Sequence, residues 1–323
     1  MTAINKNFLL ITLLTFSLYA NDIVTNYRLH GIQNLEKQLD AELAKKEYWK
    51  SYLKDKETQF GYIESYSNIL TCDKSKSTLT LYKKTKNEKY KVKKEYSAFT
   101  GKVKGDKRKE GDLKTPVGIY RLTKKISDVD SFYGPLAFVT SYPNIYDTYK
   151  GKNGSGIWIH GLPTAQERDE FTKGCIAINN DNLECLDKNI DISNTLLIIN
   201  EDKVTTELSK ERLASLLAQL YEWRYAWVYN DLENYLAFYA TEFKRHDGMN
   251  RKDFTLYKTR VFSKQETKSI IFNELNVIPY PSTEDTFKIT FKESYKSNSY
   301  SFVGDKSLIV KVVDEKLQII TEQ

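Results

Sequence analysis

The sequence reads Ile-Trp-Ile-His-Gly at residues 157–161 and Phe-Thr-Lys-Gly-Cys-Ile-Ala-Ile at residues 171–178. Both contain short apolar runs typical of buried strands, with His160 closing the first and Cys175 opening the second. Imidazole is the side chain whose ordinary pKa suits deprotonation of a thiol near neutral pH. Because the chain has only three histidines and three cysteines, this proximity predicts a thiol nucleophile and its base. A small buried hydrophobe is the structural alternative for the cysteine.

A second motif, Lys-Thr-Pro-Val-Gly-Ile-Tyr at residues 114–120, lies upstream. Together with His-Gly and Thr-Lys-Gly-Cys, it resembles the signature of the L,D-transpeptidase (YkuD-type) catalytic domain. The resemblance covers roughly residues 70–200. It implies that Cys175 is the nucleophile and His160 the general base, with a carbonyl at or beside Gly161 orienting the imidazole.

The backbone N–H groups of Gly174 and Cys175 are the expected oxyanion hole, since glycine allows the turn that aims both at one point. Trp158, Thr172 and Lys173 flank the nucleophile and are the expected substrate-binding residues. Many members of the family carry arginine two residues after the cysteine, where this chain has Ala177. Lys173 is therefore a candidate for the substrate carboxylate, with a merely solvated lysine as the alternative.

Composition limits the remaining classes of function. A chain of 323 residues is long enough for two or three domains, and the formal net charge of +6 is mild and spread along the chain. There is no zinc-binding His-Glu-x-x-His or Cys-x-x-Cys motif and no phosphate-cradling glycine loop. We therefore expect no cofactor, no metal and no nucleic-acid partner.

Residues 1–20 have the pattern of a secretory signal peptide. Lys6 precedes an apolar run at residues 8–16, which is too short to span a bilayer, and small residues lead to Asn21. An uncleaved anchor is the alternative. We therefore predict an exported, periplasmic protein without a transmembrane span. Export raises the question of a disulfide between Cys72 and Cys185, and two buried free thiols are the preferred interpretation.

Residues 21–68 have a helical pattern, with Ile32, Leu35, Leu39 and Leu43 recurring on one face. So short a segment has little core of its own, so its apolar face must pack on the next domain or on a second copy of the chain. The domain order described below favours dimerisation, and we predict a homodimer.

Residues 69–202 contain short strand-like runs separated by glycine turns, which predict a β-sandwich or mixed barrel. The expected strands are Ser77–Lys84, Tyr90–Phe99, Gly118–Leu122, Leu136–Tyr142, Gly156–His160 and Thr195–Asn200. A helix is expected at residues 181–189, capped by Asn180 or Asp181. The basic run at residues 102–109 is expected to be exposed, and the glycine-rich loop at 151–156 to be mobile.

Residues 203–323 begin with an apolar helical stripe capped by Ser209 and a second helix from Leu232, followed by alternating strands such as Phe287–Lys292. This order resembles an NTF2-like (nuclear transport factor 2-like) domain, an α+β cone with a pocket. His246 is expected in a solvated loop. The fold class is thus α+β and multidomain: a helical segment, a mostly-β catalytic domain and the cone.

The whole order resembles the cell-shape-determining peptidoglycan L,D-carboxypeptidases of helical Gram-negative bacteria. It implies removal of the terminal D-alanine from tetrapeptide stems, with glycan or peptide as a possible ligand of the C-terminal pocket. An L,D-transpeptidase is the alternative, because the motif does not say whether water or an amine resolves the thioester. A non-catalytic wall-binding scaffold is the alternative from another class.

Overall fold

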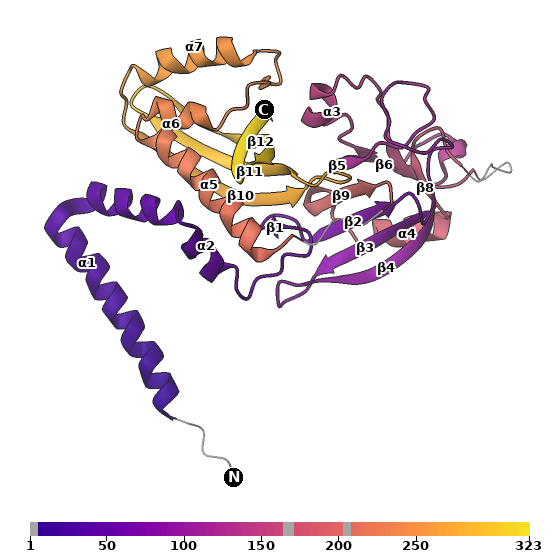
Figure 1. The fold of residues 1–323 in the computed structure, drawn as a ribbon. Helices are drawn as coiled ribbons and strands as arrows, with labels where there is room; N and C mark the ends of the chain where they lie inside the picture. Colours follow the sequence, from indigo (N-terminus) through magenta and orange to yellow (C-terminus); the bar gives the residue numbers. More distant parts are fainter. Residues whose placement is uncertain (1–5, 164–170, 203–207) are drawn as a thin grey trace.

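The computed structural model describes residues 6–163, 171–202 and 208–323, which form two domains side by side and an N-terminal helical arm (Figure 1). The arm consists of α1 (Lys6–Leu43) and α2 (Lys46–Tyr52), and α1 bends at Gly31, whose φ of 77° suits glycine. In these ranges, no helix combines the length and apolarity that a membrane crossing requires. The predicted signal peptide covers the start of α1 and residues 1–5, which lie outside the described residues, so its cleavage stays a prediction.

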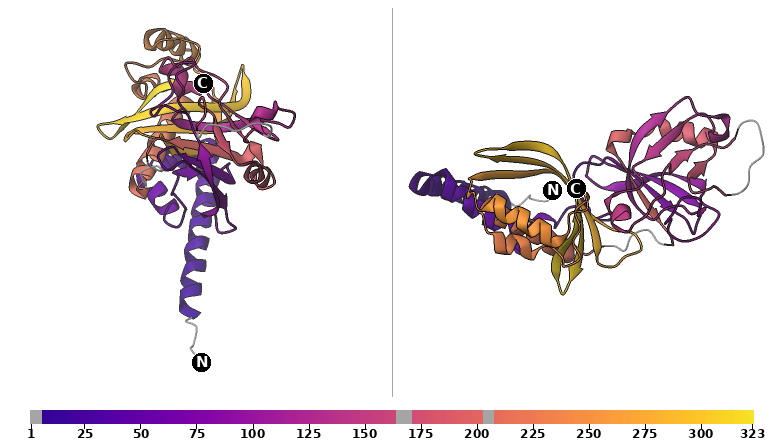
Figure 2. Two further views of the ribbon diagram at one scale, coloured as in Figure 1. Left: turned by 90° about the vertical axis from the view of Figure 1, so that its right-hand side faces the viewer. Right: turned by 90° about the horizontal axis from the view of Figure 1, so that it is seen from above.

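The arm packs on the C-terminal domain, while the first half of α1 extends away from it (Figures 1 and 2). Trp49 and Leu53 are buried in the core of that domain. Arg224 of helix α5 (Lys210–Val228) donates to Asp40 at 2.7 Å, and both side chains are more than nine-tenths buried. Of the predicted stripe, Ile32 and Leu39 stay exposed. The arm therefore covers its own chain, but not the domain that follows it in sequence, and the homodimer remains a prediction.

The first domain is a closed barrel of eight strands in the order β2-β3-β4-β8-β7-β6-β5-β9. Pairs β2–β9 and β7–β8 are parallel and the others antiparallel, so this is a mixed barrel, as the short strand-like runs indicate. Its interior is filled by aliphatic and aromatic side chains from all eight strands. The strands are β2 (Asn68–Asp73), β3 (Thr78–Lys84), β4 (Tyr90–Phe99), β5 (Gly118–Ile126), β6 (Ala137–Thr140), β7 (Trp158–His160), β8 (Ile176–Ile178) and β9 (Thr195–Asn200).

Helices and turns of the barrel domain differ in detail from the sequence expectations. Helix α4 (Asn180–Asp187) begins one residue earlier than predicted, because Asn179 is the cap and its side chain accepts from Asp181 N–H. Helix α3 (Ile145–Tyr149) was not expected; it is short and starts with a capping box formed by Asn144 and Asp147. Two 3-10 turns, η1 (Ser131–Tyr133) and η2 (Ile192–Asn194), complete the domain.

The C-terminal domain wraps helices around one face of a twisted five-stranded antiparallel sheet of order β1-β10-β11-β12-β13. Ser209 caps α5 as predicted, accepting from Arg212 N–H, and the helix buries Leu213, Leu217 and Trp223 against the sheet. Its elements are α5, α6 (Leu232–Ala237), α7 (Arg251–Phe262), β10 (Lys268–Pro279), β11 (Thr286–Ser297), β12 (Ser301–Val313) and β13 (Lys316–Glu322), with β1 (Tyr62–Ile63) added from the linker. The predicted 202/203 boundary adjoins residues 203–207, which lie outside the description.

The outer face of this sheet packs on the barrel. Ile278 and Ile309 from the sheet join Ile119 and Ile198 from the barrel in a single buried cluster. Polar groups cross the same boundary: Asn144 Nδ2 donates to Tyr280 Oη at 3.0 Å. The two domains therefore share an interface with its own apolar core.

Candidate active site

The predicted nucleophile and base lie on neighbouring parallel strands. In the β7–β8 register, Ile159 lies opposite Ile176 and His160 opposite Ala177. Cys175 immediately precedes β8, so continuing the register places it opposite Trp158, on the same face as His160. Two residues along a strand span about 6.6 Å, a separation that imidazole and thiol side chains can bridge. Strand pairing thus brings together two residues that are fifteen positions apart.

The imidazole of His160 is held in one orientation. His160 is buried, and its Nδ1 lies 2.7 Å from the carbonyl oxygen of Gly161. A carbonyl only accepts, so this contact places the ring proton on Nδ1 and leaves Nε2 as the basic nitrogen. Tyr133 packs edge-on against the imidazole, with ring centroids 5.0 Å apart, and its carbonyl accepts from Gly161 N–H at 2.8 Å. No sequence motif indicated that Tyr133, on η1, would contact His160.

Residues 161 and 174, on either side of the site, must be glycine because other atoms approach them closely. A Cβ on Gly161 would collide with Asn180 Oδ1, whose side chain also accepts from Leu162 N–H at 2.7 Å. Gly174 has φ of 136°, and a Cβ there would lie 2.8 Å from the carbonyl oxygen of Lys114. The upstream motif at residues 114–120 therefore packs, through the Lys114 carbonyl, against the loop that carries the nucleophile.

Thr172 organises the loop that carries the nucleophile. Its hydroxyl accepts from Gly174 N–H at 3.0 Å and donates to the carbonyl of Cys175 at 2.7 Å. Thr172 also pairs with Gly101, whose N–H donates to Thr115 Oγ1 at 2.8 Å. The buried Thr172 hydroxyl is thus engaged within the protein, and the structure gives it a positioning contact. Gly174 N–H, the expected oxyanion donor, is directed at this hydroxyl, and its catalytic role stays a proposal.

Trp158 and Lys173, the other two expected substrate-binding residues, differ from Thr172 in their exposure and contacts. Trp158 is half-buried and packs on Tyr133 with ring centroids 5.2 Å apart, so it forms one wall with the tyrosine that touches His160. Lys173 is exposed beside the nucleophile. Ala177 is fully buried between β4 and β7. Trp158 and Lys173 therefore remain available for substrate contact.

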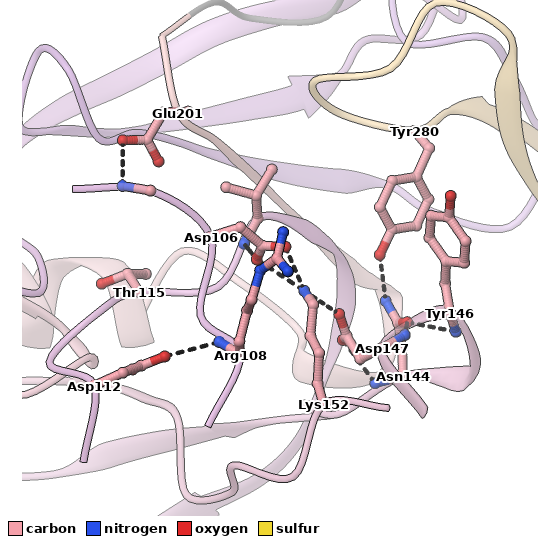
Figure 3. Close-up of polar contacts among 12 residues, drawn as sticks. Asp106, Arg108, Asp112, Thr115, Asn144, Tyr146, Asp147, Lys152, Glu201 and Tyr280 are labelled. Carbon is pink, nitrogen blue, oxygen red and sulfur yellow. Dashed lines mark hydrogen bonds and ion pairs between the residues drawn. The ribbon is translucent and has the colours of Figure 1, made fainter. Parts of the chain in front are cut away.

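A buried polar network anchors the glycine-rich loop at residues 151–156 (Figure 3). Lys152 Nζ lies 2.7 Å from carboxylate oxygens of both Asp147 and Asp106, and its side chain is 3% exposed. Tyr120 Oη also donates to Asp147, at 3.0 Å. At the other end of the loop, Cys175 Sγ contacts the carbonyl of Gly156 at 3.6 Å. Lys152 thus ties the start of the loop to the domain interior, and the mobility of the loop stays a prediction.

The basic run at residues 102–109 is also partly internal. Lys107 is buried and its Nζ lies 2.8 Å from Asp112 Oδ1. Burial opposes ionisation of Asp112, but hydrogen bonds from Lys107 and from the amides of Arg108, Lys109 and Lys114 outweigh it and hold its pKa well below its usual range. This carboxylate folds the loop back onto the Thr-Pro motif, so only part of the basic run is exposed.

The other two cysteines are free thiols. Cys72 is fully buried on β2, and burial raises its pKa to about 12, so its thiolate is not formed at neutral pH. Cys185 is half-buried on α4, where Lys94 and Asn189 contact its sulfur. The preferred expectation of unpaired cysteines agrees with this arrangement, although Cys185 is less buried than predicted. Nowhere in the described ranges do three His, Cys, Asp or Glu residues gather as a metal site would require.

Each of the two domains matches a known protein family. The profile of the L,D-transpeptidase catalytic domain (YkuD) matches residues 67–199, and that of the Cds6 C-terminal NTF2-like domain matches residues 215–323. The crystal structure of the helical cell shape determining protein Pgp2 from Campylobacter jejuni is 39% identical, with a TM-score of 0.79, covering 87% of this chain and 99% of that one. The chain belongs to the Pgp2 family.

Two further relatives are more distant. Bd1075 of Bdellovibrio bacteriovorus is 28% identical with a TM-score of 0.65, covering 80% of this chain and 92% of that chain. YafK of Escherichia coli, whose name describes it as an L,D-transpeptidase, is 32% identical over 113 residues, or 34% of this chain. The match to YafK spans only 42% of its length. The predicted fold class, a helical segment with an L,D-transpeptidase-type domain and an NTF2-like domain, is confirmed.

Proposed function

We propose that this protein is a periplasmic, cysteine-dependent L,D-carboxypeptidase of peptidoglycan that removes terminal D-alanine from tetrapeptide stems and so influences cell shape. The observation that carries the proposal is an oriented imidazole, His160 on β7, with Cys175 immediately before the neighbouring parallel strand β8, inside a domain of the L,D-transpeptidase type. The similarity to Pgp2 along nearly the whole chain supports a role in cell shape.

The proposed mechanism uses both nitrogens of His160. Nε2 takes the thiol proton of Cys175 while Nδ1–H stays bonded to the Gly161 carbonyl, and the thiolate attacks the carbonyl carbon between the stem and D-alanine. The oxyanion is stabilised by the backbone N–H groups of Cys175 and Gly174. The Gly174 N–H must first give up its hydrogen bond to the Thr172 hydroxyl. Such a donor contributes about 3–4 kcal/mol in measured cases.

Collapse of this intermediate breaks the C–N bond, and D-alanine leaves with the proton from His160. The product is a thioester on Cys175. His160 then takes a proton from water, and the hydroxide attacks the thioester carbonyl, releasing the tripeptide carboxylate and restoring the thiol. An amine in place of this water would give a cross-link. In this proposal Trp158 and Lys173 contact the stem, and Lys173 meets the D-alanine carboxylate.

We extend the proposal to the interior of the C-terminal domain, as a second contact with glycan or peptide. Lys258 lies inside the cone with its Nζ 4.8 Å from the Trp227 ring centroid and 5.0 Å from that of Tyr235. Lys306 pairs with Glu322 at 3.2 Å nearby. Aromatic faces with an ammonium group suit sugar rings and carboxylates. In a sacculus pull-down, Lys258→Met is expected to bind less than Lys296→Met, an exposed control; equal binding contradicts this extension.

The test of the proposed reaction is mass spectrometry of purified tetrapeptide muropeptides incubated with the protein. Conversion to tripeptides with release of D-alanine is the expected outcome. Cross-linked dimers would instead support the L,D-transpeptidase alternative, toward which the name of YafK points. Unchanged muropeptides, under conditions where the protein is folded, would contradict both and leave the scaffold alternative.

A further inference from the structure

A cavity of about 390 Å³ lies between the barrel and the outer face of the C-terminal sheet. This volume falls within the range of small-molecule sites, about 300–1,000 Å³. Barrel residues Tyr66, Arg121 and Asn144 line one side, and Asn276, Lys288 and Thr290 line the other. The cavity is therefore separate from the cone interior, which lies on the opposite face of the same sheet.

Lys288, on β11, is a buried cation without a carboxylate partner among the described residues. Its side chain is 8% exposed, and its Nζ has one hydrogen bond, to the carbonyl of Ile119 at 3.1 Å. An ammonium group has three donors, and a buried charge is costly unless it is paired. Burial, followed by repulsion from Arg121, lowers the pKa of Lys288 to about 8, while Asp147 acts in the opposite direction. The lysine is thus held in an unfavourable electrostatic environment.

Arg121, on β5, adds a second positive group to the same cavity. Its ion pair with Asp305, at 3.3 Å, joins side chains that are 56% and 72% exposed, so the attraction is weak. Among the charged residues that line the cavity, cations outnumber anions. These residues are Arg121, Lys288 and Lys292 against Glu274 and Asp305. Lys306 and His246 also line the cavity, but Lys306 is already paired with Glu322 at 3.2 Å. An anion bound here would satisfy the donors of Lys288 and lower its repulsion with Arg121.

We propose that this interdomain cavity is a binding site for a small carboxylate ligand, such as an amino acid or short peptide, held by Lys288 and Arg121. The choice of a carboxylate over a phosphate rests on the proposed function, because wall peptides and their released amino acids present carboxylates. A carboxylate accepts hydrogen bonds from an ammonium group and a guanidinium fork at the same time.

The site also has a structural connection to the catalytic domain. Ile119 O, which accepts from Lys288 Nζ, accepts from Asn144 Nδ2 as well, at 3.1 Å. Asn144 caps α3 and bonds Tyr280, and its N–H donates to Asp147, the partner of Lys152 (Figure 3). A ligand on Lys288 would therefore touch the same hydrogen-bonded group that anchors the loop next to Cys175.

The experiment is a titration of the ¹⁵N-labelled protein with N-acetyl-D-alanine, followed by the backbone amide signals of Ile119 and Arg121. Saturable shifts at these amides are expected, and Lys288→Met should weaken binding about tenfold or more. Lys296→Met, an exposed lysine on the same strand, is the matched control and should bind like the wild type. Raising the pH from 7 to 9.5 should weaken binding, because Lys288 then loses its proton.

The amide spectrum of Lys288→Met reports whether that variant is folded, and the exposed substitution Arg121→Gln provides an independent second test. Absence of saturable shifts, binding that survives both substitutions, or binding of inorganic phosphate without N-acetyl-D-alanine would each overturn the proposal. Because the titration needs no turnover, a failure of muropeptide trimming is a separate result that bears on the proposed function alone.

Discussion

Replacing Lys152 by methionine tests whether the buried network in Figure 3 holds the active-site loop. The substitution removes the cation between Asp147 and Asp106, each 2.7 Å away, and keeps a side chain of similar length. Asp147 is 1% exposed at its side chain, so its charge would be left without compensation. Removing one partner of a buried ion pair costs about 3–5 kcal/mol.

Hydrogen exchange of the paired amides in β5 and β9 measures this cost within the barrel, without assuming that the two domains unfold together. A loss of 3–5 kcal/mol corresponds to about two to three and a half orders of magnitude in protection. Lys125→Met is the matched control, since the Lys125–Asp187 pair, at 2.6 Å, is partly exposed and should contribute about 1 kcal/mol or less.

The same loop connects Lys152 to the nucleophile. The kcat should also fall, because Gly156, which contacts Cys175 Sγ, belongs to the loop that Lys152 anchors. A loss of protection below tenfold, or equal losses in both variants, would refute this reasoning.

Four further predictions concern the nucleophile, the pH profile of activity, the pH dependence of stability, and assembly. Cys175→Ala should abolish muropeptide turnover at near wild-type stability while Cys72→Ala retains turnover; activity in the first variant would exclude the proposed nucleophile. The kcat/KM should follow a bell-shaped pH profile and resist EDTA, and zinc-restorable loss on chelation would contradict the Cys–His chemistry. Burial lowers the pKa of Lys258 from 10.5 to about 8, so the unfolded chain binds more protons than the folded chain between these pH values. The free energy of unfolding should therefore rise with pH in this window. In calorimetry, Lys258→Met should show a smaller rise than the wild type. The exposed Ile32 and Leu39 should support a homodimer, and charged substitutions there should yield monomers by light scattering; a wild-type monomer at micromolar concentration would contradict the dimer.

Local signals in the sequence were sufficient for much of the fold. Short strand-like runs, continuously apolar in β9, placed β3, β4 and β9 within a residue of their observed ends. Ser209 marked the start of α5, because capping depends on a few neighbouring groups. The spacing of His160, Gly174 and Cys175 predicts the candidate site, and the catalytic roles of these residues stay proposals. The helices α3 and α7 were missed, since α3 is only five residues long and α7 buries few positions.

Tertiary structure alone decided which distant groups meet. Lys152 reads as a loop lysine, yet it is buried because Asp106 and Asp147 come from other segments to surround it. Lys288 follows the alternation of an exposed strand face, and it is buried only because the barrel covers that face. Strand periodicity reports which side of a sheet a residue occupies, whereas the partner that packs there depends on contacts between residues far apart in the chain.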